Sequence, residues 1–122
     1  MAVFPSTTFI TGVLNLIKND SPYLALYTSN PGAGDTGTEV TGGSYARQAI
    51  TFGSITSGSM SNNSTITFSG LPSATITHYG IRNASTSGDL LVYGTLNSPA
   101  VIVSGDQLQF SSSSITVNLS GS

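Results

Sequence analysis

The sequence offers few side chains that could carry out catalysis. Its single histidine, His78, would need a nucleophile and an orienting acid beside it to act as a base. Serines are abundant, but none lies in a Gly-x-Ser-x-Gly motif. In an expected alternating strand over residues 75–81, His78 shares a face with Ile76, which favours a packed or half-buried imidazole. Because the chain has no cysteine, disulfides, thiolate nucleophiles and cysteine metal sites are excluded. We therefore expect no catalytic residues and no enzymatic activity.

Two carboxylates, Asp35 and Glu39, share a long turn-rich loop over residues 29–43. Loop oxygens are the ligands that calcium prefers, but this loop lacks the ligand density of an EF-hand. A glycosidase needs a pair of carboxylates across a groove, and one flexible loop does not supply it. We favour a solvated turn or an ion pair with Arg47 on the strand that follows. The sequence thus predicts no metal and no cofactor.

Charged residues make up only 7% of the chain, against roughly a quarter in an ordinary soluble domain. Serine and threonine take their place. A surface so poor in charge is weakly protected against association, so we expect copies of the chain, or a partner, to cover much of it. Three cations, Lys18, Arg47 and Arg82, are too few for a nucleic-acid footprint or a basic membrane-binding face. We expect no nucleic-acid partner and no membrane partner.

The chain begins with an apolar segment, residues 1–22, that we distinguish from a β domain over residues 23–122. Ser6 or Thr7 can cap a helix whose apolar residues recur at helical spacing, and Pro22 follows its end. The helix could cap the strands of its own subunit, which we favour, or insert between subunits. The residues predicted to dock on other chains are Val3, Phe4, Phe9 and Ile10.

From Tyr23 onward the apolar period changes to two, which indicates strands. We expect residues 23–28 to form a central strand, because both of its faces are apolar. Residues 55–60 are expected to pair with 65–69 across a turn at 61–64. Gly80 suggests a bulge or a close backbone approach. Further strands are expected at 45–52, 75–82, 90–96, 100–103, 107–111 and 115–119. The predicted fold is all-β: an antiparallel sandwich or jelly-roll-like barrel of about eight strands with a short N-terminal helix.

Several motifs in the β region resemble one family of proteins. They lie at residues 23–32 (YLALYTSNPG), 43–52 (GSYARQAITF), 64–68 (STITF), 78–81 (HYGI), 88–96 (GDLLVYGTL) and 104–108 (SGDQL). Their order and spacing resemble the small virion proteins of tailed bacteriophages, described as tail-fibre or capsid decoration proteins. The resemblance implies a virion component without known catalytic residues. It also implies framework roles for Tyr45, Arg47 and Phe52, with Arg47 holding the acidic loop.

These observations predict a capsid decoration, or cement, protein that forms a homo-oligomer, such as a trimer, and braces the major capsid protein. The alternative is a tail-fibre or tail-tip protein that binds a host surface glycan and contacts tail proteins. Five tyrosines could stack on sugars if they were exposed together, although we favour packing roles for them. The N-terminus lacks the basic segment and long apolar core of a signal peptide. We therefore expect synthesis in the host cytoplasm and a final location in the virion.

Overall fold

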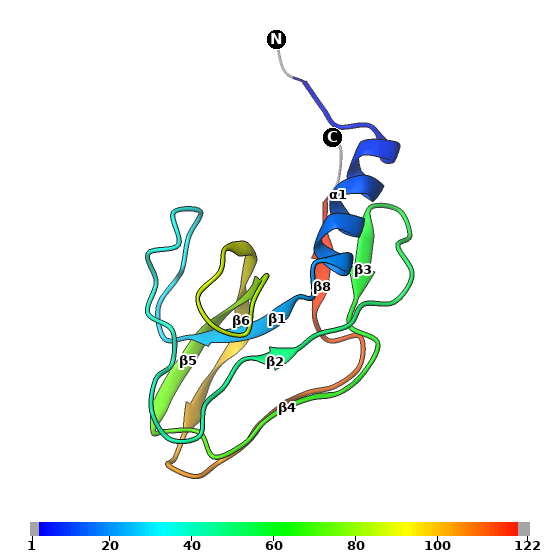
Figure 1. The fold of residues 1–122 in the computed structure, drawn as a ribbon. Coiled ribbons are helices and arrows are strands. Elements are labelled where there is room, and N and C mark those ends of the chain that lie inside the picture. Colours follow the sequence, from blue (N-terminus) through cyan, green and yellow to red (C-terminus); the bar gives the residue numbers. More distant parts are fainter. Residues whose placement is uncertain (1–2, 120–122) are drawn as a thin grey trace.

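The computed structural model describes residues 3–119 and contains one helix and eight strands over that range. The helix lies alongside β3 and β8, whereas β1, β5 and β6 form the other part of the molecule (Figure 1). The elements are α1 (Thr7–Asn19), β1 (Tyr23–Tyr27), β2 (Gln48–Ala49), β3 (Ser59–Ser61), β4 (Ile66–Phe68), β5 (Ala74–Arg82), β6 (Leu90–Ile102), β7 (Leu108–Phe110) and β8 (Thr116–Asn118).

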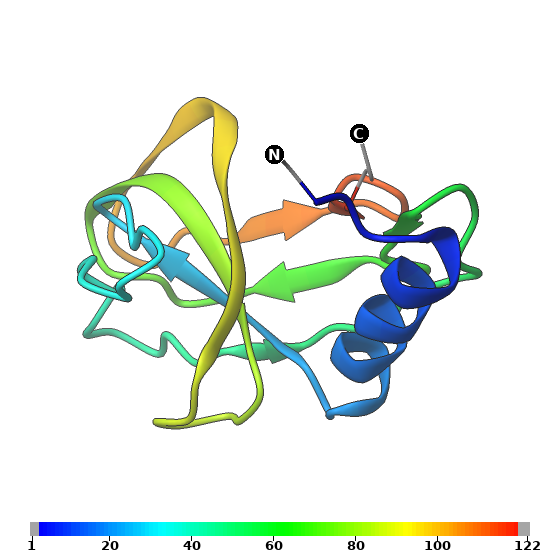
Figure 2. The same cartoon turned by 90° about the horizontal axis from the view of Figure 1, so that it is seen from above.

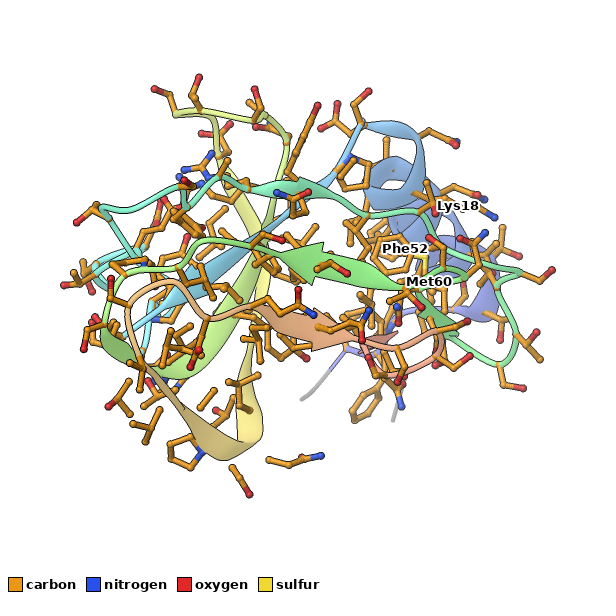
Figure 3. All side chains as sticks on the ribbon, turned by 90° about the horizontal axis from the view of Figure 1, so that it is seen from below. Lys18, Phe52 and Met60 are labelled. Atoms are coloured by element: carbon orange, nitrogen blue, oxygen red, sulfur yellow. The ribbon has the colours of Figure 1, made fainter. Side chains whose placement is uncertain are left out.

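The predicted helix is confirmed, and it packs on strands of its own chain. The Ser6 hydroxyl caps it by accepting a hydrogen bond from the Phe9 N–H at 3.2 Å. Its buried face is a stripe at helical spacing, and this stripe belongs to the single apolar core of the molecule. At the other end, Lys18 Nζ donates to the Gly53 carbonyl at 3.0 Å. Figure 3 shows Lys18, Phe52 and Met60 where the helix meets the strands beneath it.

One layer is a four-stranded antiparallel sheet in the order β2-β1-β5-β6. The prediction that β1 is central is confirmed, because β2 and β5 flank it and its residues 24–27 are buried. Residues 90–96 and 100–103 are not separate strands, because β6 runs unbroken from Leu90 to Ile102. Pro99 is tolerated inside β6 because this strand is at the edge of the sheet and pairs only with β5 among the described residues.

The other layer pairs β3 with β8 and β4 with β7. The predicted hairpin between residues 55–60 and 65–69 is therefore wrong. We expected Asn62 in the turn of that hairpin, but it is 1% exposed and lies between β3 and β4. The chain does not reverse there, because β3 and β4 pair one after the other with β8 and β7. The side-chain amide of Asn62 donates to the carbonyls of Ser64 and Ser111, and its Oδ1 accepts from the Ile115 N–H. These bonds satisfy a buried polar group and fix the long-range pairing.

The strand after the long loop is much shorter than the predicted span 45–52. Only residues 48–49 form β2, but Ile50 N–H donates to the Pro22 carbonyl and Phe52 bridges to Asn62. The segment 48–53 therefore passes from β1 in one layer to β3 in the other. In Figure 2, β5 and β6 cross over the strands of the second layer. The predicted all-β fold is confirmed in its sandwich form, and the described strands do not close a barrel.

Gly80 is explained by close packing and not by a bulge. The register shifts of β5 lie between Ile76 and His78 and between Ile81 and Arg82, whereas Gly80 pairs regularly. A Cβ at Gly80 would come within 2.7 Å of Leu90 Cδ1 and 2.9 Å of Tyr27 Cε1. At the first shift β5 advances two residues while β6 advances five, so the extra residues lie on β6 and β5 keeps its alternation from Ile76 to His78. The expectation of a half-buried His78 is confirmed.

Candidate interaction surface

The structure divides the four predicted docking residues into two groups. Val3, Phe4 and Phe9 are exposed, with 93%, 64% and 64% of their surface accessible. Ile10 is buried in the core with Leu14 and Ile17. It lies on the helix face that covers the strands, so it packs within its own subunit.

A second apolar stripe on the helix, Phe9, Val13 and Leu16, lies beside the buried one. Leu16 is 72% exposed. Gly12, Val13 and Leu16 form one wall of a groove of about 740 Å³. Leu91 and Val92 of β6 and Leu119 line the rest of its apolar surface, and Asn15, Asn19 and Asp20 add polar groups toward the end of the helix. We call this the helix groove.

A second groove of about 380 Å³ lies between β6 and β8, where no described strand bridges the two layers. We call it the strand groove. Tyr79, Tyr93, Thr116 and Asn118 contribute aromatic, hydroxyl and amide groups to it. Tyr93 is 44% exposed, whereas the other four tyrosines are buried or half-buried. An exposed cluster of all five tyrosines is therefore not formed. The strand groove shares Leu91, Val92 and Leu119 with the helix groove, so the two are continuous.

On the other side, the acidic loop is fastened by an ion pair that the sequence predicted. Arg47 forms a bidentate pair with Glu39, with Nε–Oε2 and Nη2–Oε1 distances of 2.8 Å. Arg47 Nη1 also donates to the carbonyls of Ala84 and Ser87 in the β5–β6 connection. The Tyr45 hydroxyl donates to Glu39 at 2.7 Å and accepts from the Leu26 N–H. Arg47 thus ties the loop to the β5–β6 connection, and Tyr45 ties the loop to β1.

A second ion pair, between Arg82 and Asp35, was not predicted. Both guanidinium Nη atoms of Arg82 donate to the Asp35 carboxylate at 2.9 Å. Arg82 also donates to the Tyr27 hydroxyl and the Gly88 carbonyl, each at 2.9 Å. Both carboxylates of the candidate calcium loop are therefore engaged by guanidinium groups. Within residues 3–119, no three histidine, aspartate or glutamate side chains gather as a metal-ligand cluster.

The ion pairs set the protonation of this network. The hydrogen bonds from Arg82 hold the pKa of Asp35 below its ordinary value. Burial raises the pKa of Glu39, but hydrogen bonds from Arg47 and Tyr45 outweigh it, so the pKa of Glu39 is also lowered. Burial and the hydrogen bond to Glu39 raise the pKa of Tyr45 far above its usual range. At neutral pH, two ionised carboxylates face two guanidinium groups, and the network is structural.

All three cationic side chains are thus engaged in hydrogen bonds within the described range. The large hydrophobic side chains that are exposed among the described residues are Val3, Phe4, Phe9, Leu16, Tyr93, Val101 and Val103. No helix among residues 3–119 is both long and apolar enough to span a membrane.

Comparison with known proteins identifies the family. The family model described as podophage GP4 fiber I protein gp80 matches residues 10–118, which include most of the helix and every described strand. A search of curated proteins finds no match. The predicted resemblance to small virion proteins of tailed phages is confirmed by this match. The chain belongs to the family of the podophage GP4 fiber I protein gp80, and it is a phage virion protein of the tail-fibre type.

Proposed function

We propose that this protein is a module of a phage tail fibre that binds a glycan on the host surface. The family match over residues 10–118 carries the fibre assignment. It favours the alternative of our sequence analysis over capsid decoration, which remains a prediction without support of its own. We further propose that the protein is not an enzyme, that it works as a homo-oligomer, and that it contacts other tail proteins.

The strand groove is the surface whose chemistry suits a sugar best. A pyranose ring presents an apolar face to an aromatic side chain, and the ring of Tyr93 is half exposed at this groove. Thr116 and Asn118 supply hydrogen-bonding groups on the opposite strand. Its volume of about 380 Å³ falls within the range of small-ligand sites. The Asn62–Asn63 region is a poorer choice, because Asn62 is buried in the fold.

Replacing Tyr93 by alanine should weaken binding to polysaccharide extracted from the host surface roughly tenfold, since stacking of one aromatic ring contributes about 1.5 kcal/mol. The fold should survive, because Tyr93 is partly exposed and lies on an edge strand. Titration calorimetry with the purified protein measures the change directly.

Val101→Ala is the matched control, because Val101 lies on the same strand, is 74% exposed and does not line the groove. It should leave binding unchanged. Equal affinities for Tyr93→Ala and the unaltered protein would remove glycan binding from the strand groove, while the fibre assignment would still rest on the family.

A further inference from the structure

The first described residues form an apolar arm that its own chain leaves uncovered. Residues 3–6 precede the helix without regular structure, and Val3 and Phe4 are 93% and 64% exposed. Figure 1 shows this arm leading away from the start of α1. Burying a phenylalanine side chain contributes about 1.5–3 kcal/mol relative to leaving it in water. An arm of this kind therefore gains stability from any apolar groove that it can reach.

The helix groove has the size and the chemistry to receive that arm. Its volume of about 740 Å³ can hold more than one apolar side chain, and no described residue fills it. Leu16, which is 72% exposed, forms part of its wall. The helix backbone leaves room there as well, because a Cβ at Gly12 would have no heavy atom within 4 Å.

Charge favours the arm over other occupants of this groove. Residues 3–9 carry no charged side chain, and Asp20 is the one charged residue that lines the groove. Docking the arm there adds no charge to the groove and breaks no ion pair, because neither ion pair of the described residues lines it. A sugar would find few hydrogen-bonding partners beside Val13, Leu91 and Val92. The arm and the groove are complementary surfaces of the same chain.

In its own chain the arm lies outside the helix groove, because Val3 and Phe4 are exposed and neither of them lines it. The arm also cannot bring its backbone close to Leu16 of the same chain. Ten residues of helix separate Ser6 from Leu16 along the axis by about 15 Å. The two residues from Phe4 to Ser6 span at most about 7 Å. The Cα atoms of Phe4 and Leu16 in one chain therefore stay roughly 8 Å apart or more while the helix is intact.

We propose that the arm of one copy inserts Val3 and Phe4 into the helix groove of a neighbouring copy. Two copies that exchange arms reciprocally form a two-fold dimer, and copies that each pass the arm on in one direction form a ring when the rotation between them closes. The contact proposed here rests on the homo-oligomer proposed above, because it is the contact that would join the copies.

Disulfide cross-linking tests the contact directly, because the natural chain has no cysteine. A tagged chain carrying Phe4→Cys is co-expressed with an untagged chain carrying Leu16→Cys, and the purified mixture is oxidised. A disulfide needs a Cα–Cα separation of about 4.4–6.8 Å, which the two positions reach only between chains. We expect a dithiothreitol-sensitive dimer of one tagged and one untagged chain.

The matched control pairs Phe4→Cys with Val101→Cys, since Val101 is as exposed as Leu16 and lies outside the groove. Cysteines at positions 4 and 16 should cross-link at least tenfold faster than cysteines at positions 4 and 101. Equal rates would overturn the proposal. It would also fail if one chain carrying both Phe4→Cys and Leu16→Cys gave only internally bridged monomers.

Leu16→Glu provides a second readout that does not use cysteine. It should shift the protein toward monomer in sedimentation experiments, whereas Val101→Glu should not. An unchanged mass for Leu16→Glu would contradict the arm exchange. Both experiments use purified protein without glycan, so their failure is distinct from a failure of Tyr93→Ala to weaken glycan binding.

Discussion

Replacing Phe68 by alanine is expected to lower the free energy of unfolding by about 3–5 kcal/mol, which is a large part of the stability of a domain of this size. Phe68 is 1% exposed. Its ring stacks on Tyr45 at a centroid distance of 6.0 Å and meets Phe110 edge-on at 6.1 Å. Truncation leaves a cavity between Tyr45, β4 and β7, which the rigid strands cannot fill. Urea denaturation at neutral pH measures the change.

His78→Ala is the control for this substitution, because His78 is half-buried and makes one side-chain hydrogen bond, with Thr77. It should cost much less than Phe68→Ala. Equal losses of stability at the two positions would show that the assignment of the core face is wrong.

Replacing Arg47 by methionine is expected to cost about 3 kcal/mol at pH 7, because breaking a buried ion pair leaves a charge without its partner. The Arg47 side chain is 8% exposed and that of Glu39 is 22% exposed, so solvent screens the pair only weakly. Glu39 would keep only the Tyr45 hydroxyl, and the Ala84 and Ser87 carbonyls would lose their donor. Methionine keeps most of the apolar volume of the arginine stem, so the loss reports the charge.

The same pair predicts how stability depends on pH. The pKa of Glu39 is lower in the folded state than its ordinary value of 4.5, so its contribution is fully present above that pH. The contribution is lost as the pH falls through the lowered pKa. Asp35 acts in the same direction below its ordinary value of 3.8. Thermal unfolding followed from pH 7 to pH 3 should therefore show a falling melting temperature below about pH 4.5.

Glu39→Gln is the control for the pH dependence. It should lower stability at pH 7 and reduce the fall on the acid side, since one of the two shifted carboxylates is gone. A Glu39→Gln variant with the same acid-side fall as the unaltered protein would show that Glu39 does not contribute to it.

Local patterns in the sequence were sufficient to predict the elements whose contacts lie close together in the chain. The helix followed from a capping serine and a repeating apolar stripe, and β1 from its two apolar faces. The pair between Arg47 and Glu39 followed from eight residues of separation. In each case the partners are close in the chain, so their types and spacing determine the contact.

The contacts that were missed join residues far apart in the chain. β3 pairs with β8 across more than fifty residues, and nothing near residues 59–61 signals that partner. The sequence around Asn62 is typical of a turn, and its actual role depends on hydrogen bonds to Ser111 and Ile115, about fifty residues away. The Arg82–Asp35 pair likewise depends on how the long loop folds over β5.

The helix groove also could not be predicted from local patterns in the sequence. Phe9, Ile10, Val13 and Leu14 form two adjacent apolar stripes, and periodicity alone does not show which stripe faces the core. The helix groove needs residues from the helix, from β6 and from position 119. It became visible only when the three were brought together.

The central claim, that this protein is part of a tail fibre, is tested most directly by locating it on the phage particle. An antibody raised against the purified protein, carrying gold, can be bound to intact virions and imaged by electron microscopy. We expect gold at the tail, with few particles on each virion. Gold spread over the whole head would contradict the fibre assignment and favour capsid decoration.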